Sequence, residues 1–132
     1  MGCDIHGVVQ AQVHDWYYQA EGVIDIGPLL ERDYHTFGNL FGVRGVQFDE
    51  WPKIKVHEGL PEGFLANFGI EELLWEDGKL DAHSPHWVVL EELEKIPLST
   101  YPEDWQFLLR LMQILRDQFD GRPVRLVVWF DN

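Results

Sequence analysis

The chain has 132 residues, of which 45% are hydrophobic and 25% charged, the size and balance of one globular domain covering residues 1–132. Its 23 acidic residues against 10 Lys and Arg give a formal net charge of -13, which argues against general binding to nucleic-acid backbones. A single cysteine excludes an intramolecular disulfide, and neither a membrane span nor a signal peptide is expected, so the predicted location is the cytoplasm.

Two strands are expected at the start of the chain. Apolar and polar residues alternate over residues 3–13, with the period of two that is typical of a β-strand. Residues 16–26 are rich in β-branched and aromatic side chains. They predict a second strand that pairs with the first through a turn at residues 14–15 and ends at Gly27-Pro28.

A short helix is predicted at residues 34–41. Phe37, Leu40 and Phe41 recur there at helical spacing, and Gly42 is placed to end the helix.

The middle of the chain has little periodicity. Residues 44–63 contain several Gly and Pro residues and predict a long surface loop, of the kind that is often functional in a small domain. A short helix is expected near residues 71–75 and a loop at 83–85. Residues 87–90 predict either a short strand or the entry into a helical turn at 91–95.

The last third carries the clearest patterns. A capping box formed by Thr100 and Glu103 predicts the start of a helix over residues 100–119. Residues 124–130 are apolar on both faces, which is typical of a central strand. We therefore expect an α+β fold whose first and last strands are adjacent and antiparallel in an antiparallel or mixed sheet, with the helix packed on it. The apolar face of this helix consists of Trp105, Leu108, Leu109, Met112, Leu115 and Phe119.

The strand ends supply the main candidate site. Asp4 and His6 stand two residues apart, so their side chains leave one face of the first strand. Asp131 follows the last strand, and antiparallel pairing of the two strands would bring it beside them. Two carboxylates and a histidine in one place would either bind a divalent cation or raise the pKa of one acid for general-base chemistry. The alternative is a hydrogen-bonded surface pair.

Histidines near residue 85 form a second candidate. His83 and His86 have the spacing of a zinc ligand pair or of groups beside a reacting phosphate, and His83 is the better candidate. Solvated loop histidines are the alternative. Cys3 is interpreted as a small buried side chain, because no base lies on its face of the strand.

Arginines bracket the first helix. Arg32 and Arg44 could clamp a carboxylate or phosphate by paired hydrogen bonds, or they could pair with the many acidic side chains of the chain.

These motifs together resemble a family of small, mostly phage-encoded hypothetical proteins. The likeness is carried by Met1 to His6, by Arg32-Asp33-Tyr34 with Phe37, by Gly42-Val43-Arg44, by His83-Ser84 with Trp87, by Leu90-Glu91-Glu92-Leu93, and by Trp129-Phe130-Asp131-Asn132. The resemblance implies a phage or prophage origin, and hence the cytoplasm of a host cell, but it carries no established activity. It also implies a cluster of Cys3, Asp4, His6, Arg32, Tyr34, Arg44, His83, Ser84 and Asp131.

Two functions compete. The first is a hydrolase, expected to be metal-assisted, in which Asp4, His6 and Asp131 hold a divalent metal and, with His83, activate water. It would act on a small anionic molecule of nucleotide type, such as a host-defence signal. The second is a protein without catalysis that sequesters a small ligand or blocks a host protein. The substrate or ligand contacts are expected from Arg32, Tyr34, Arg44, Ser84, Trp87 and Trp129.

Overall fold

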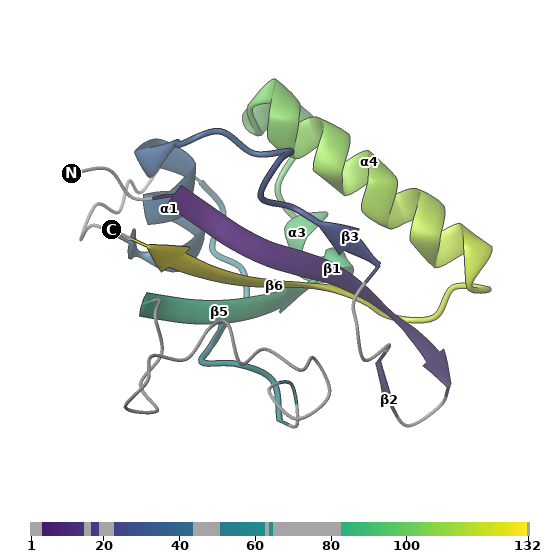
Figure 1. The fold of residues 1–132 in the computed structure, drawn as a ribbon. Coiled ribbons are helices and arrows are strands. Elements are labelled where there is room, and N and C mark those ends of the chain that lie inside the picture. Colours follow the sequence, from purple (N-terminus) through teal and green to yellow (C-terminus); the bar gives the residue numbers. More distant parts are fainter. Residues whose placement is uncertain are drawn as a thin grey trace, which may run out of the picture.

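The computed structural model describes residues 4–14, 17–18, 23–43, 51–62, 64 and 83–131. They form an antiparallel sheet with helices on one of its faces (Figure 1), which confirms the expected α+β class. The elements in chain order are β1 (Asp4–His14), β2 (Tyr17–Tyr18), β3 (Ile24–Asp25), α1 (Tyr34–Phe41), β4 (His57–Glu58), β5 (His83–Val89), α3 (Leu90–Leu93), a 3-10 turn (Leu98–Thr100), α4 (Glu103–Gln118) and β6 (Val124–Asp131).

The first and last strands are neighbours, as predicted. The strand order is β2-β1-β6-β5-β4, and β3 also pairs with β1. The antiparallel ladder between β1 and β6 begins with Asp4 opposite Asp131 and runs to Ala11 opposite Val124. Because β6 lies between β1 and β5 and is covered on both faces, every residue from Val124 to Phe130 is buried.

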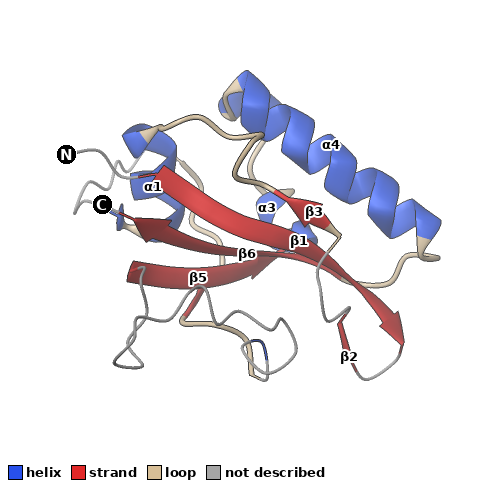
Figure 2. Cartoon of the chain, viewed as in Figure 1, coloured by secondary structure: helices blue, strands red, loops and turns tan. Residues whose placement is uncertain are grey.

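The alternation along β6 separates two cores. Leu126, Val128 and Phe130 face the helices and belong to the main core, whereas Val127 and Trp129 belong to a smaller cluster on the opposite face. Figure 2 shows α1, α3 and α4 in blue, gathered on one side of the red strands. Because side chains alternate between the two faces of a strand, the same alternation tells which face the side chains at the ends of β1 and β6 occupy.

Helix α1 has the predicted bounds because both of its ends are capped. The Asp33 side chain accepts a hydrogen bond from the backbone N–H of Thr36 at 3.2 Å. At the other end, Gly42 adopts a left-handed conformation with φ of 66° and donates its N–H to the Gly38 carbonyl, as the C-cap position requires.

The start of α4 differs from the prediction. The helix begins at Glu103, its N-cap is Pro102 in extended conformation, and no side chain caps it. Thr100 does not form a capping box with Glu103 because it lies in the preceding 3-10 turn, where its N–H donates to the Pro97 carbonyl. The negative charges of Glu103 and Asp104 in the first turn instead stabilise the helix by interacting with the positive end of its dipole.

Two strand predictions are also corrected. Residues 16–26 do not form one strand; within the described part, Tyr17–Tyr18 and Ile24–Asp25 pair separately with β1, and β1 has a bulge where it meets β2. The expected loop at 83–85 is part of β5, since a bulge between His83 and His86 accommodates Pro85 beside β6.

Other predictions fall on residues outside the described part of the chain, namely Asp15 of the turn at residues 14–15, the helix near 71–75, and Arg44 with the rest of 44–50. None of the helices that the structure describes has both the length and the apolar character needed to span a bilayer.

An ion pair ties α4 to the segment after α3. Arg116 Nη1 and Nη2 donate to Glu94 Oε1 and Oε2 at 2.5 and 3.0 Å, and these bonds hold the pKa of Glu94 below its usual range. Because the folded pKa is lowered, the pair stabilises the fold above the unfolded pKa, and that stability is lost as the pH falls through the folded pKa.

We therefore expect Glu94→Gln to lower the free energy of unfolding by about 0.2–1 kcal/mol at neutral pH. In acid the difference from wild type should disappear, since wild-type Glu94 is then neutral too. Urea unfolding across a pH series measures this, with Glu62→Gln, at an exposed acid outside both helices, as control. A deficit that stays constant down to the lowest pH would contradict the role of the ion pair.

Candidate functional site

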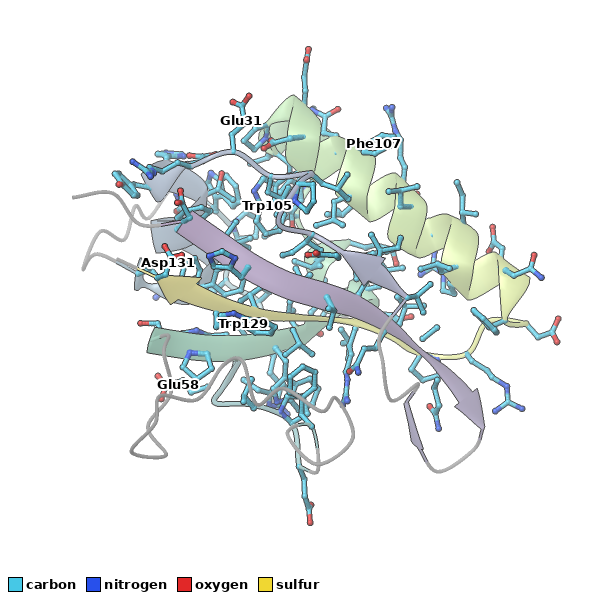
Figure 3. All side chains as sticks on the ribbon, in the orientation of Figure 1. Glu31, Glu58, Trp105, Phe107, Trp129 and Asp131 are labelled. Atoms are coloured by element: carbon cyan, nitrogen blue, oxygen red, sulfur yellow. The ribbon has the colours of Figure 1, made fainter. Side chains whose placement is uncertain are left out.

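The polar site forms where β1 starts and β6 ends. Asp4 pairs directly with Asp131, and His6 pairs with Trp129. Since side chains two residues apart share a face of a strand, Asp4, His6, Trp129 and Asp131 all belong to the face opposite the helices. Asp131 lies at the end of β6 in Figure 3. The register of β1 against β6 therefore brings Asp4, His6 and Asp131 together, as the sequence predicts.

His6 and Asp131 are in direct contact. His6 Nε2 lies 2.5 Å from Asp131 Oδ2, and Asp131 Oδ1 accepts the backbone N–H of Asp4 at 3.2 Å. The two side chains are 42% and 43% exposed, so solvent and a ligand can reach both. An ionised carboxylate only accepts hydrogen bonds, so Nε2 carries the proton, and in the neutral ring Nδ1 is then a base.

Arg32, just before α1, completes the cluster. Its Nε and Nη2 each lie 3.0 Å from Asp4 Oδ1. This contact lowers the pKa of Asp4 and raises that of Arg32. Both side chains are about half exposed, at 48% for Arg32 and 52% for Asp4. Because Asp4 engages only one side of the guanidinium, Nη1 can still donate to a bound anion.

Both carboxylates of the cluster have hydrogen-bond donors within the chain. Asp4 pairs with the Arg32 guanidinium, and Asp131 accepts from the Asp4 N–H and from His6 Nε2. Within the described residues, no group of three or more His, Cys, Asp or Glu side chains is arranged to hold a metal ion. The expected ligands Asp4, His6 and Asp131 are thus brought together, but as hydrogen-bonded pairs.

The predicted aromatic contacts lie on the same face and pack tightly. Trp129 is 8% exposed, and its ring centre lies 6.1 Å from that of Phe64. Trp87 stacks on His57 at 3.9 Å, and the Arg125 guanidinium lies 5.7 Å from its ring centre. Both tryptophans therefore form part of the smaller core.

The remaining candidates are spread out. Tyr34 opens α1, two residues after Arg32, and is 37% exposed. Ser84 has a left-handed backbone with φ of 52°. Cys3, Arg44 and the side chain of His83 lie outside the described residues.

A pocket on the helix side was missed by the sequence analysis. It has a volume of about 310 Å³, and its lining includes Asn39, Trp51, Glu58 and His86. The sequence pattern around His86 indicates only a solvated loop residue or a weak zinc ligand. The one sequence signal for the pocket was the Gly- and Pro-containing segment after α1, which was expected to be a functional loop.

No protein-family model, no curated protein and no solved structure matches the chain. What the protein does must therefore be inferred from its own residues and their contacts.

Proposed function

We propose that Asp4, His6, Arg32 and Asp131 form the acid–base centre of a hydrolase that acts on a small anionic substrate. The observation that carries the proposal is the 2.5 Å contact between His6 Nε2 and Asp131 Oδ2. A carboxylate that holds one ring nitrogen of a half-exposed histidine leaves the other nitrogen as a base, which is the arrangement used in general acid–base catalysis.

The chemistry follows from these contacts. His6 Nδ1 takes a proton from water, and the water oxygen forms a bond to the electrophilic atom of the substrate. Asp131 stabilises the resulting imidazolium. As the bond to the leaving group breaks, the proton on Nδ1 passes to that group. Arg32 donates to the anionic part of the substrate and is itself oriented by Asp4.

Both carboxylates already have partners, because Asp4 pairs with Arg32 and Asp131 accepts a hydrogen bond from His6 Nε2. A divalent cation bound by Asp4, His6 and Asp131 would have to replace both pairs. The metal-assisted form expected from the sequence is therefore the second form to test, and a chelator separates the two.

The resemblance to phage-encoded proteins makes nucleotide-type signals of the host's defence the first substrates to test. A net charge of -13 repels such anions at long range. The guanidinium of Arg32 counters this repulsion locally, since charge–charge energies depend on the nearest groups once a ligand is bound.

We expect His6→Ala and Asp131→Asn each to lower turnover by about 10²- to 10⁴-fold while the unfolding midpoint changes little, because both side chains are more than 40% exposed. The assay is hydrolysis of a nucleotide panel by the purified protein, with thermal unfolding recorded in parallel. Glu103→Gln, an exposed acid at the start of α4, is the control for loss of one carboxylate.

The outcomes of this assay distinguish a metal-free hydrolase, a metal-assisted hydrolase, a sequestering protein and a purely structural cluster. Turnover that survives a chelator supports the metal-free form, and turnover that needs added metal supports the metal-assisted form. Tight binding without turnover by wild type would favour the sequestering protein. Full activity in both variants would show that the cluster only stabilises the fold.

A further inference from the structure

The pocket on the helix side has the features of a built ligand site. It lies between the end of α1, the segment over residues 51–58 and β5, and its volume of about 310 Å³ is at the lower end of the range for small-molecule sites. Leu40, Phe41 and Trp51 supply apolar walls. Three of its polar groups, Asn39, Glu58 and His86, come from separate elements and each offers a hydrogen-bond acceptor.

His86 is an oriented acceptor. Its Nδ1 lies 2.8 Å from the Ser84 carbonyl, and since a carbonyl oxygen only accepts, Nδ1 carries the proton and Nε2 of the neutral ring accepts. The Phe41 ring packs on the imidazole at 5.5 Å. The left-handed backbone of Ser84 lies within the bulge of β5, a feature that re-aims side chains near functional sites.

Glu58 is the second acceptor. It pairs directly with His86 across β4 and β5, so the two side chains leave the same face of the sheet close to each other. Glu58 is exposed and lies beside the lower edge of the sheet in Figure 3.

Asn39 is the third. Its Nδ2 donates to the His35 carbonyl at 2.9 Å, which fixes the orientation of the amide. Its Oδ1 is buried and has no hydrogen-bond partner among the described residues. Buried acceptors in folded proteins are almost always paired, and an unpaired one calls for an explanation. A donor seated in the pocket would supply the missing partner.

We propose that this pocket binds a flat nitrogen heterocycle that carries amino groups. The ring packs among Phe41, Leu40 and Trp51, and the amino and ring N–H groups donate to Asn39 Oδ1, Glu58 and His86 Nε2. Lys53 is a cation at the lining and contributes no acceptor. The site is separate from the Asp4–His6–Asp131 cluster, because His86 pairs with Val128, whose side chain belongs to the helix-side core, whereas Asp131 belongs to the opposite face.

The test uses 2,6-diaminopurine as the probe and purine, which lacks the amino groups, as its matched control. Titration calorimetry should show 2,6-diaminopurine binding at least about tenfold more tightly than purine, the difference expected for one hydrogen bond to a charged acceptor. Equal binding of the two compounds, or binding of neither, would overturn the proposal.

Variants locate the binding. Glu58→Gln keeps the shape of an exposed side chain and should weaken 2,6-diaminopurine binding about tenfold, whereas Glu103→Gln should not. Asn39→Leu removes the unpaired oxygen, so it should weaken binding without lowering the unfolding midpoint. His6→Ala should bind the probe like wild type, which separates this site from the proposed hydrolase centre. Unchanged binding in both Glu58→Gln and Asn39→Leu would overturn the assignment.

Discussion

Trp105→Ala should lower the free energy of unfolding by about 3–5 kcal/mol. Trp105 is fully buried at 0% exposure, and it lies between α4 and the sheet in Figure 3. Its ring lies 6.3 Å from those of Phe41 and Tyr101, and both neighbours are themselves buried. Since three elements meet around this ring, they cannot collapse into the space that alanine would leave. Urea unfolding of wild type and variant measures the loss.

Two further variants test whether burial of the Trp105 ring is the cause of the lost stability. Phe107 lies on the same helix but is 51% exposed, so Phe107→Ala should stay within about 0.5 kcal/mol of wild type. Trp105 Nε1 is buried and has no hydrogen-bond partner in the part of the chain that the structure describes, so Trp105→Phe removes an unsatisfied donor as well as volume. It should therefore cost clearly less than Trp105→Ala. Equal losses for Trp105→Ala and Phe107→Ala would contradict the assignment of the buried face.

The elements that the sequence predicted well are those with strong periodicity. The apolar face of α4 includes Trp105 and Met112, both buried, because a helix that packs on a sheet must bury one stripe. Strand β6 is apolar on both faces, and such a strand is expected in the centre of a sheet that is covered on both sides. The capping box at Thr100 failed because a local alternative was available: the chain forms a 3-10 turn first, and Pro102 fits the extended N-cap position.

The site was partly predictable for the same reason. Alternation along β1 fixed the common face of Asp4 and His6, and antiparallel pairing brought Asp131 beside them. The contact of Arg32 with Asp4 joins residues 28 apart in the chain, and Arg32 lies in the irregular segment between β3 and α1. The sequence left open whether Arg32 binds an anion or pairs with an acid, and in the structure it contacts Asp4.

The pocket at His86 could not be predicted from alternation alone. A count by twos from Val88 assigns His86 to the helix side, but the rest of the lining comes from the end of α1 and from the segment over residues 51–58, which alternation along β5 does not place. The bulge between His83 and His86 adds one residue to β5 relative to β6, so the same count fails for the residues before it. Ser84 carries the irregular backbone, and a serine gives no sequence signal for a left-handed conformation. The pairing of His86 with Glu58 also depends on β4, which is only two residues long.

Gly7→Ala should destabilise the fold by about 3 kcal/mol or more and also disturb the proposed catalytic site. Gly7 has φ of 154°, and a Cβ there would lie 2.0 Å from the Val127 carbonyl oxygen and 3.0 Å from Val128 Cα. These are backbone atoms of the central strand, so they cannot rotate away as a side chain can. The methyl group fits only if β1 and β6 separate at this point.

The separation would act on the neighbouring residue. His6 precedes Gly7 and reaches Asp131 across the same two strands, so moving β1 away from β6 lengthens the contact on which the base depends. Gly121→Ala is the matched control, because Gly121 also has positive φ, at 77°, but a Cβ there meets nothing within 4 Å. It should cost only about 1–2 kcal/mol and leave hydrolysis unchanged. Urea unfolding and turnover per folded molecule measure both effects. If the two glycine variants behaved alike, strain at positive φ would explain both, and the close approach of β1 to β6 would not be what holds His6 against Asp131.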